Sequence, residues 1–148
     1  MRLEPTSSVD PITVVRRLVE AINRGDWAAL RELLHPAFRR HSTAAGSTGA
    51  EDATAFVRFL QKEHKAYPDA HEDILDIFCS GSKVAARHSF SGTQLGPLDA
   101  CAPTGKRVQS VYIAIYRVEN DCIAEAWAEW DNLADLRQLG HTPGPAHT

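Results

Sequence analysis

The sequence lacks the features that mark disulfide-bonded, zinc-binding or membrane-spanning proteins. Its three cysteines, Cys79, Cys101 and Cys122, lie 22 and 21 residues apart. This spacing fits neither a disulfide framework nor the close cysteine pairs of a zinc site, so we expect reduced thiols. No apolar run approaches the ~20 residues that a spanning helix needs, and the polar N-terminus has no apolar signal-peptide segment. We therefore expect a cytoplasmic protein without a membrane partner.

An excess of one charge is also missing. Sixteen Lys and Arg residues stand against nineteen Asp and Glu residues, and the formal net charge is -3. The basic residues are scattered, and the longest runs are only Arg16-Arg17 and Arg39-Arg40. This pattern argues against a nucleic-acid partner. With 43% hydrophobic and 24% charged residues, the composition is that of a folded globular protein, and we expect one domain over residues 1–148.

The common signatures of cofactor and metal chemistry are absent as well. The sequence contains no GxGxxG after a strand, no GxxxxGK[ST], no HExxH, no GxSxG and no Cys-x-x-Cys. None of the seven histidines pairs with another ligand at metal-site spacing. We expect no metal and no cofactor, so that an enzyme of this sequence would work with its side chains and a shaped pocket.

The first half of the chain has the apolar periodicity of helices. Helices are predicted over residues 11–24, 27–34 and 51–65. Asp10 and Asp26 precede the first two of them as N-caps. The small polar residues that precede the third helix predict a loop.

From His71 onward the pattern changes to the alternation of strands. The predicted strands cover residues 71–80, 83–94, 107–118 and 122–131. They form two hairpins, and a short helix over 132–139 and a frayed tail over 141–148 follow. Helices followed by antiparallel strands predict an α+β fold, in which the N-terminal helices pack in the concave face of a curved, mostly antiparallel sheet.

The densest group of chemically active side chains lies on the last strand. Glu125, Trp127, Glu129 and Asp131 project from one face, because alternate residues of a strand share a face. Two interpretations remain open: this face meets solvent, or it lines a cavity while the small residues of the other face pack under helices.

Several histidines are further candidates, although a structural or surface role is commoner for each. His41 follows a basic pair, His64 lies on the apolar stripe of the third helix, and His88 lies in mid-strand. Arg87 and His88 are neighbours on one strand, so only one of them faces inward, and periodicity leaves open which.

The second half of the chain carries a set of short motifs. They are Gly-Thr, Pro-Thr-Gly-Lys, Arg-Val-Glu, Ile-x-Glu-x-Trp-x-x-x-Asp and Leu-x-Gln-Leu-Gly, formed by Gly92, Thr93, Pro103, Thr104, Gly105, Lys106, Arg117, Val118, Glu119, Ile123, Glu125, Trp127, Asp131, Leu136, Gln138, Leu139 and Gly140. In these motifs the chain resembles the SnoaL-like polyketide cyclases, a branch of the nuclear-transport-factor-2-like superfamily with a cone-shaped α+β barrel. It departs from the family at Gln94 and Ala126, where histidines are usual, and at His88, where an aromatic is frequent.

The resemblance implies that the acidic face of the last strand lines the pocket and that Asp131 is the catalytic acid/base. Glu129 is the second candidate, followed by His41 and His88. Trp127 would supply a flat wall for a polycyclic substrate. The other residues expected to bind substrate are Arg87, Gln94, Phe56, Leu60 and His64.

The resemblance implies an enzyme of polyketide or related secondary metabolism, such as antibiotic biosynthesis. Its reaction would be an intramolecular aldol-type cyclisation of a small hydrophobic substrate, driven by acid/base catalysis. Two alternatives remain: an epoxide hydrolase or isomerase that uses the same pocket, and a non-catalytic ligand-binding or dimerisation domain. The relatives also pair through the convex face of the sheet, which predicts a homodimer that covers either Tyr112 and Tyr116 or Ile113 and Ile115.

Overall fold

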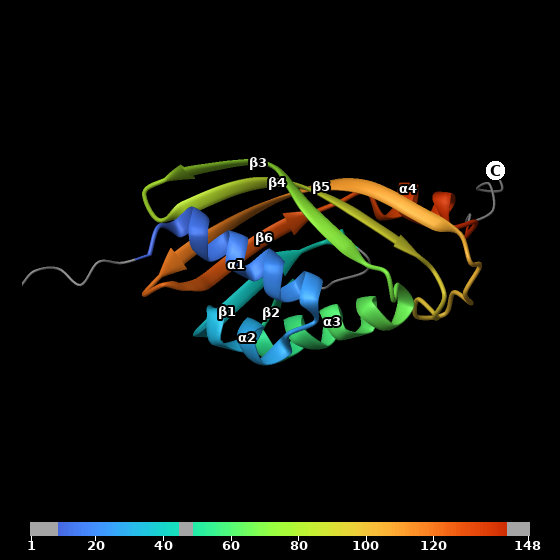
Figure 1. Cartoon of the computed structure of the whole chain (residues 1–148), viewed down its shortest axis with the longest axis horizontal. Helices are drawn as coiled ribbons and strands as arrows, with labels where there is room; N and C mark the ends of the chain where they lie inside the picture. The colour runs from blue at the N-terminus through green and yellow to red at the C-terminus, as the bar shows by residue number, and fades with distance from the viewer. Residues whose placement is uncertain (1–8, 45–48, 142–148) are drawn as a thin grey trace, which may run out of the picture.

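The chain folds as one curved sheet with its helices on the concave side (Figure 1). The computed structural model describes residues 9–44 and 49–141, so the predicted tail lies outside the described residues from residue 142 onward. The elements are α1 (Pro11–Arg24), α2 (Trp27–Leu33), β1 (Leu34–Ser42), β2 (Gly49–Glu51), α3 (Ala53–Ala66), β3 (His71–Ser80), β4 (Lys83–Thr93), β5 (Arg107–Glu119), β6 (Cys122–Glu129) and α4 (Asn132–Gln138).

The helix boundaries follow local signals in the sequence. The Asp10 side chain accepts a hydrogen bond from the Ile12 amide at 2.8 Å, and Gly25 ends α1 in the left-handed conformation at φ 63°. Asp26 and Asp52 cap α2 and α3 in the same way. The three predicted N-terminal helices are confirmed.

The six strands lie in the order β2-β1-β6-β5-β4-β3. Neighbours from β3 to β6 pair antiparallel, whereas β1 runs parallel to β6. The sheet stays open, since β2 and β3 form its two edges among the described residues. The predicted α+β class is confirmed, and so are the four predicted strands, except at the end of the last one. The prediction that this strand extends to Asp131 is wrong: β6 ends at Glu129, and Asp131 caps α4 instead.

Strands β1 and β2 were not predicted from the sequence. The assignment of Leu34 to the end of a helix is wrong: it begins β1, which continues through Pro36. Proline cannot donate a ladder hydrogen bond, and the pairing of β1 with β6 is irregular between Leu34 and Arg39. The strand therefore lacks a clear local signal and depends on its pairing with β6.

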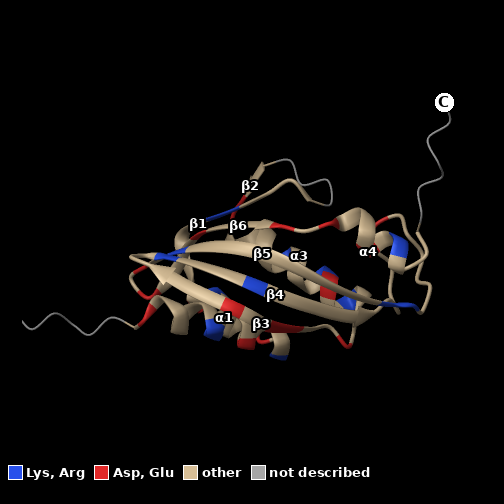
Figure 2. Cartoon of the chain, turned by 90° about the horizontal axis from the view of Figure 1, so that it is seen from above, with Lys and Arg blue, Asp and Glu red and all other residues tan. Residues whose placement is uncertain are grey.

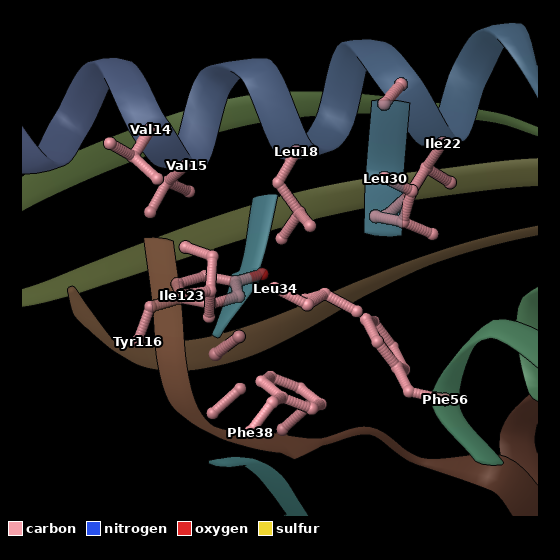
Figure 3. Close-up of a cluster of buried hydrophobic side chains, with 14 of the residues drawn as sticks. Val14, Val15, Leu18, Ile22, Leu30, Leu34, Phe38, Phe56, Tyr116 and Ile123 are labelled. Carbon is pink, nitrogen blue, oxygen red and sulfur yellow. The ribbon is translucent and has the colours of Figure 1, made fainter. Parts of the chain in front are cut away.

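The core fills the concave face beneath α1. Val14, Val15 and Leu18 point from α1 toward the sheet, and Phe38 of β1 stacks on Phe56 of α3 with ring centroids 5.4 Å apart (Figure 3). These side chains form the core between α1, α3 and the sheet, and Leu18 and Phe56 also reach a cavity. This cavity lies between α3, α4 and the concave face of the sheet.

The central strand β5 separates the two faces clearly. Tyr112 and Tyr116 point to the concave side, while Val111, Ile113 and Ile115 are exposed on the convex side, Ile113 with 58% of its surface accessible. Seen from above in Figure 2, the middle of β5 carries no charged residue. Exposed aliphatic residues in a row are typical of a surface that a partner covers.

We predict a homodimer formed by this convex face. Light scattering should give about twice the 16.3 kDa of one chain. Ile113→Glu should lower the mass to that of one chain, because a charge would be buried in an apolar interface. Arg17→Glu on the exposed side of α1 is the matched control and should remain dimeric. A wild-type mass near that of one chain would contradict the prediction.

Candidate functional site

A cavity of about 1180 Å³ lies between α3, α4, the concave face of the sheet and the segment 97–101. This volume lies just above the roughly 300–1,000 Å³ that is typical of small-molecule sites. Ala126 and Ala128 of β6 form its floor, where larger side chains would fill the space. Its apolar wall includes Phe56, Leu60, Phe90, Trp130, Leu136 and Leu139.

The acidic face of β6 lies on the other side of the sheet. Ala124, Ala126 and Ala128 are buried on the concave side, so the alternate residues Glu125, Trp127 and Glu129 project from the convex side. The expectation that this acidic face lines the pocket is therefore wrong. Small side chains pack more easily under the helices, and this decides which face of the strand turns inward.

The convex side of β1 and β6 carries a polar cluster. His41 Nε2 lies 2.7 Å from Glu125 Oε2, and the His41 ring stacks on Trp127 with centroids 5.5 Å apart. The hydrogen bond with His41 holds the pKa of Glu125 below its ordinary value. Glu129 accepts hydrogen bonds from the amide and hydroxyl of Thr43, both at 3.2 Å. His41, Trp127 and Glu129 are thus together, but outside the cavity.

Asp131 is exposed and serves as the N-cap of α4. Its Oδ1 atom accepts a hydrogen bond from the Ala134 amide at 2.9 Å. Asp131 is not part of the cavity wall, although Trp130 and Asn132 on either side of it are. The residue therefore lies at the rim of the cavity, and its catalytic role stays a prediction.

His88, not Arg87, faces the concave side. The His88 ring is fully buried, its Nε2 atom lies 3.0 Å from the Tyr116 hydroxyl, and it stacks on Tyr112 at 4.5 Å. Burial lowers the pKa of His88 to about 4, so the ring is neutral near pH 7. Arg87 is exposed and pairs with Asp76 at 2.6 Å.

Of the remaining predicted residues, some make structural hydrogen bonds and others line the cavity. Gln94 is fully buried, and its amide donates to the carbonyl oxygens of Cys101 and Ala102, both at 3.3 Å. His64 Nδ1 donates to the Leu60 carbonyl at 3.1 Å, outside the main cavity. Among the residues expected to bind substrate, Phe56 and Leu60 do line the cavity.

Glu72 on β3 is a buried carboxyl in the cavity wall that the sequence analysis missed. Only 7% of its surface is accessible, and the Tyr112 hydroxyl donates to its Oε1 atom at 2.6 Å. Its Oε2 atom is buried without a hydrogen-bond partner in the described structure. Burial raises the pKa of Glu72 to about 7, although the Tyr112 hydrogen bond opposes the shift.

Two further carboxyls reach the same cavity. Burial, followed by the nearby Glu72 charge, raises the pKa of Glu63 on α3 to about 8. Burial also raises the pKa of Asp135 on α4, whose Oδ2 accepts a hydrogen bond from the Ser110 hydroxyl at 3.4 Å. Glu63 is therefore mostly protonated near pH 7, while Glu72 exists in both forms.

Arg40 brings a positive charge into this acidic cavity. Its guanidinium is buried and lies 4.8 Å from the centroid of the Phe59 ring and 5.7 Å from that of Trp130. Its Nη1 atom pairs with Glu51 at 3.5 Å. The aromatic rings hold the cation against the cavity wall through cation–π attraction.

A bulge explains why the alternation of β3 did not reveal Glu72. The pairing of β3 with β4 shifts between Ile74 and Asp76. Ile74 and Ile77 both pack on the core, whereas strict alternation would place them on opposite faces. Glu63 had a usable signal, because it follows Phe56 by seven residues and lies on the same helical stripe.

The described part of the chain holds no group of three or more His, Cys, Asp and Glu residues placed to bind a metal ion. No helix within residues 9–44 and 49–141 is both long and apolar enough to cross a membrane.

The curved sheet, the helices in its concave face and the cavity between them define a nuclear-transport-factor-2-like α+β fold. The chain belongs to the SnoaL-like polyketide cyclase family, whose model matches residues 12–139. The family expectation from the sequence motifs is thereby confirmed.

Relatives of known name lie within this family or share its fold. The chain is 29% identical over 135 residues to aklanonic acid methyl ester cyclase DnrD of Streptomyces peucetius, across 87% of this chain and 90% of DnrD. The crystal structure of IdmH, a putative polyketide cyclase from Streptomyces antibioticus, superimposes with a TM-score of 0.81 at 28% identity, covering 89% and 99% of the two chains. AclR, a putative hydroxylase from Streptomyces galilaeus, also reaches 0.81 at 22% identity, covering 94% and 86%, and shares the fold.

The buried carboxyls predict that stability falls as pH rises from about 4.5 to about 8. Over this range the folded protein holds protons on Glu72 and Glu63 that the unfolded chain has released, because both folded pKa values lie above the ordinary value of 4.5. Glu72→Gln should weaken this dependence and stabilise the fold relative to wild type by about 1–3 kcal/mol near pH 8. Urea unfolding of both proteins at several pH values measures the free energy of unfolding and its dependence on pH.

Glu20→Gln, at an exposed position of α1, is the matched control and should keep the wild-type pH dependence. Equal pH dependence of Glu72→Gln and wild type would contradict a raised pKa at Glu72.

Proposed function

We propose that this protein catalyses an intramolecular aldol-type cyclisation of a hydrophobic polycyclic polyketide and needs no cofactor for it. The observation that carries the proposal is a cavity of about 1180 Å³ with aromatic walls and buried carboxyls. The pKa values of about 7 and 8 for Glu72 and Glu63 lie near the pH at which such an enzyme works. General acid/base catalysis is most effective when the pKa of the group lies near the working pH.

Aldol closure requires two proton transfers. A carbon flanked by carbonyl groups loses a proton to a base and becomes an enolate, which attacks a second carbonyl carbon of the same molecule. The attacked carbonyl oxygen then receives a proton and becomes a hydroxyl group. Because the enolate charge is delocalised over the flanking carbonyls, carboxyl side chains are strong enough for both steps.

The cavity wall suits the substrate of such a reaction. Phe56, Phe59 and Trp130 offer flat apolar surfaces for fused rings. The buried guanidinium of Arg40 favours an anionic enolate over the neutral substrate, because charge interactions are strong where water is excluded.

The similarity to DnrD suggests the first substrate to try. We expect the purified protein to convert aklanonic acid methyl ester, or a related polyketide ester, into a ring-closed product of unchanged mass. Liquid chromatography with mass spectrometry measures this, with heat-denatured protein as the control.

The same experiment separates the alternatives. Hydrolysis of the ester would release methanol and leave a lighter acid, whereas an epoxide analogue converted into a product heavier by one water molecule would indicate an epoxide hydrolase. A product of unchanged mass in which NMR shows no new ring would indicate an isomerase. Binding of the compound without any conversion would indicate a ligand-binding domain. Failure to bind or convert a panel of such polyketides would contradict the proposal.

Asp131 remains our proposal for the base that removes the carbon proton, on the strength of its match to the family motif. Asp131→Asn keeps an oxygen that can cap α4 but removes the ionisable group. We expect turnover to fall by about 10²–10⁴-fold with little change in melting temperature. Stopped-flow or product assays together with thermal unfolding check both values.

A purely structural role of Asp131 predicts a different result. If the residue acts only as the cap that accepts from Ala134, turnover and melting temperature of Asp131→Asn should both stay close to wild type. That outcome would remove Asp131 from the reaction.

A further inference from the structure

Glu72 is buried in the wall of the cavity, which is a placement typical of a functional group. It lies at the start of β3, in the cavity wall, with 7% of its surface accessible. A buried carboxyl with an unsatisfied oxygen costs stability, and proteins retain such groups mainly at functional sites. Its antiparallel partner on β4 is the apolar Phe90, so no charge on the neighbouring strand pairs with it directly.

The position of Glu72 is fixed from two sides. The Asn23 side chain at the end of α1 donates to the Glu72 carbonyl oxygen and accepts from the Glu72 amide, both at 2.8 Å. On the side-chain end, the Tyr112 hydroxyl donates to Oε1 at 2.6 Å. Oε1 is therefore occupied as an acceptor, and Oε2 is the atom that is free to carry a proton.

We propose that Glu72 is the general acid that delivers a proton from its carboxyl group to the attacked carbonyl oxygen of the substrate, while Tyr112 positions this group. Because the Oε2 atom is buried, the carboxyl group must rotate toward the cavity when the substrate binds. This inference rests on the proposed cyclase function and adds the second catalytic group that the reaction needs.

The proton balance closes without any further reactant. The substrate C–H bond breaks and its proton passes to the base, for which Asp131 is the proposed group. A C–C bond forms as the π bond of the attacked carbonyl breaks, and its oxygen takes the proton from Glu72. After the product leaves, Asp131 at the exposed rim returns its proton to water, and Glu72 takes one up.

The two acids suit opposite roles because their surroundings differ. Asp131 is exposed at the cavity rim, whereas Glu72 is buried, and burial favours its neutral form. A pair of carboxyls whose environments differ in this way provides a base and an acid at the same pH.

The charged and titratable groups around Glu72 determine where it loses its proton. They come from four elements and are His71 on its own strand, Arg40 on β1, Glu63 on α3, and Tyr112 and Tyr116 on β5. His71, Arg40 and the Tyr112 hydrogen bond favour the ionised form, but burial outweighs them and raises the pKa of Glu72 to about 7.

The proposal is tested by the pH dependence of kcat/KM with the polyketide ester that wild type converts. For wild type we expect activity to fall as pH rises through about 7, because the acid form is lost. Glu72→Gln keeps the size of the side chain and an oxygen that accepts from Tyr112, but has no proton to transfer. It should lower kcat by about 10²-fold or more and abolish this alkaline fall.

Tyr112→Phe provides a readout that a merely structural role would not change. It removes the hydrogen bond that stabilises the ionised carboxyl, so the pKa of Glu72 should rise and the alkaline fall should move to higher pH. Glu20→Gln, exposed on α1 and not one of the groups around Glu72, is the matched control and should keep both the rate and the pH profile of wild type.

The outcomes are distinguishable. A wild type that converts no polyketide overturns the cyclase function and the role of Glu72 with it. A wild type that is active while Glu72→Gln has similar kcat and the same pH profile overturns the role of Glu72 alone. Carbon NMR of Glu carboxyl groups checks that the folded Glu72→Gln protein lacks one resonance that titrates near neutral pH in wild type.

Discussion

The small side chains of β6 are the constraint on which the site depends. Ala124, Ala126 and Ala128 turn toward the concave side, and Ala126 and Ala128 form part of the cavity wall. Larger residues there would occupy the volume that a ligand needs. The same alternation sends the charged residues of β6 to the convex side, so the concave side must receive its acids from other elements: Glu63 from α3, Glu72 from β3 and Asp135 from α4.

Acids buried in this way work against the stability of the fold. Moving a carboxylate out of water is unfavourable, and the group responds by holding its proton, so its pKa rises. The apolar core beneath α1, with Phe38 stacked on Phe56, offsets this cost. The core and the acidic cavity adjoin, since Leu18 and Phe56 belong to both, and a stable core next to destabilising groups is common where a site requires such groups.

Local interactions explain which elements were predictable from the sequence. The interval from the cap at Asp10 to the left-handed Gly25 defines α1, and a run of β-branched and aromatic residues indicates β5. Both signals come from neighbours along the chain. In contrast, β1 contains Pro36 and follows a helix directly, so only its pairing with β6 makes it a strand. The bulge in β3 likewise conceals that Glu72 and Ile77 share the concave side.

The sequence by itself determined the helix caps, the strands of the two hairpins, the α+β class and the family motifs, because each depends on residues that are close together in the chain. Only the tertiary structure decided the location of the site. Alternation shows that a strand has two unlike faces, but which face turns inward depends on the summed packing of helices and strands distant in sequence. That packing turned Glu129 outward and brought Glu63, Glu72 and Arg40 to one cavity.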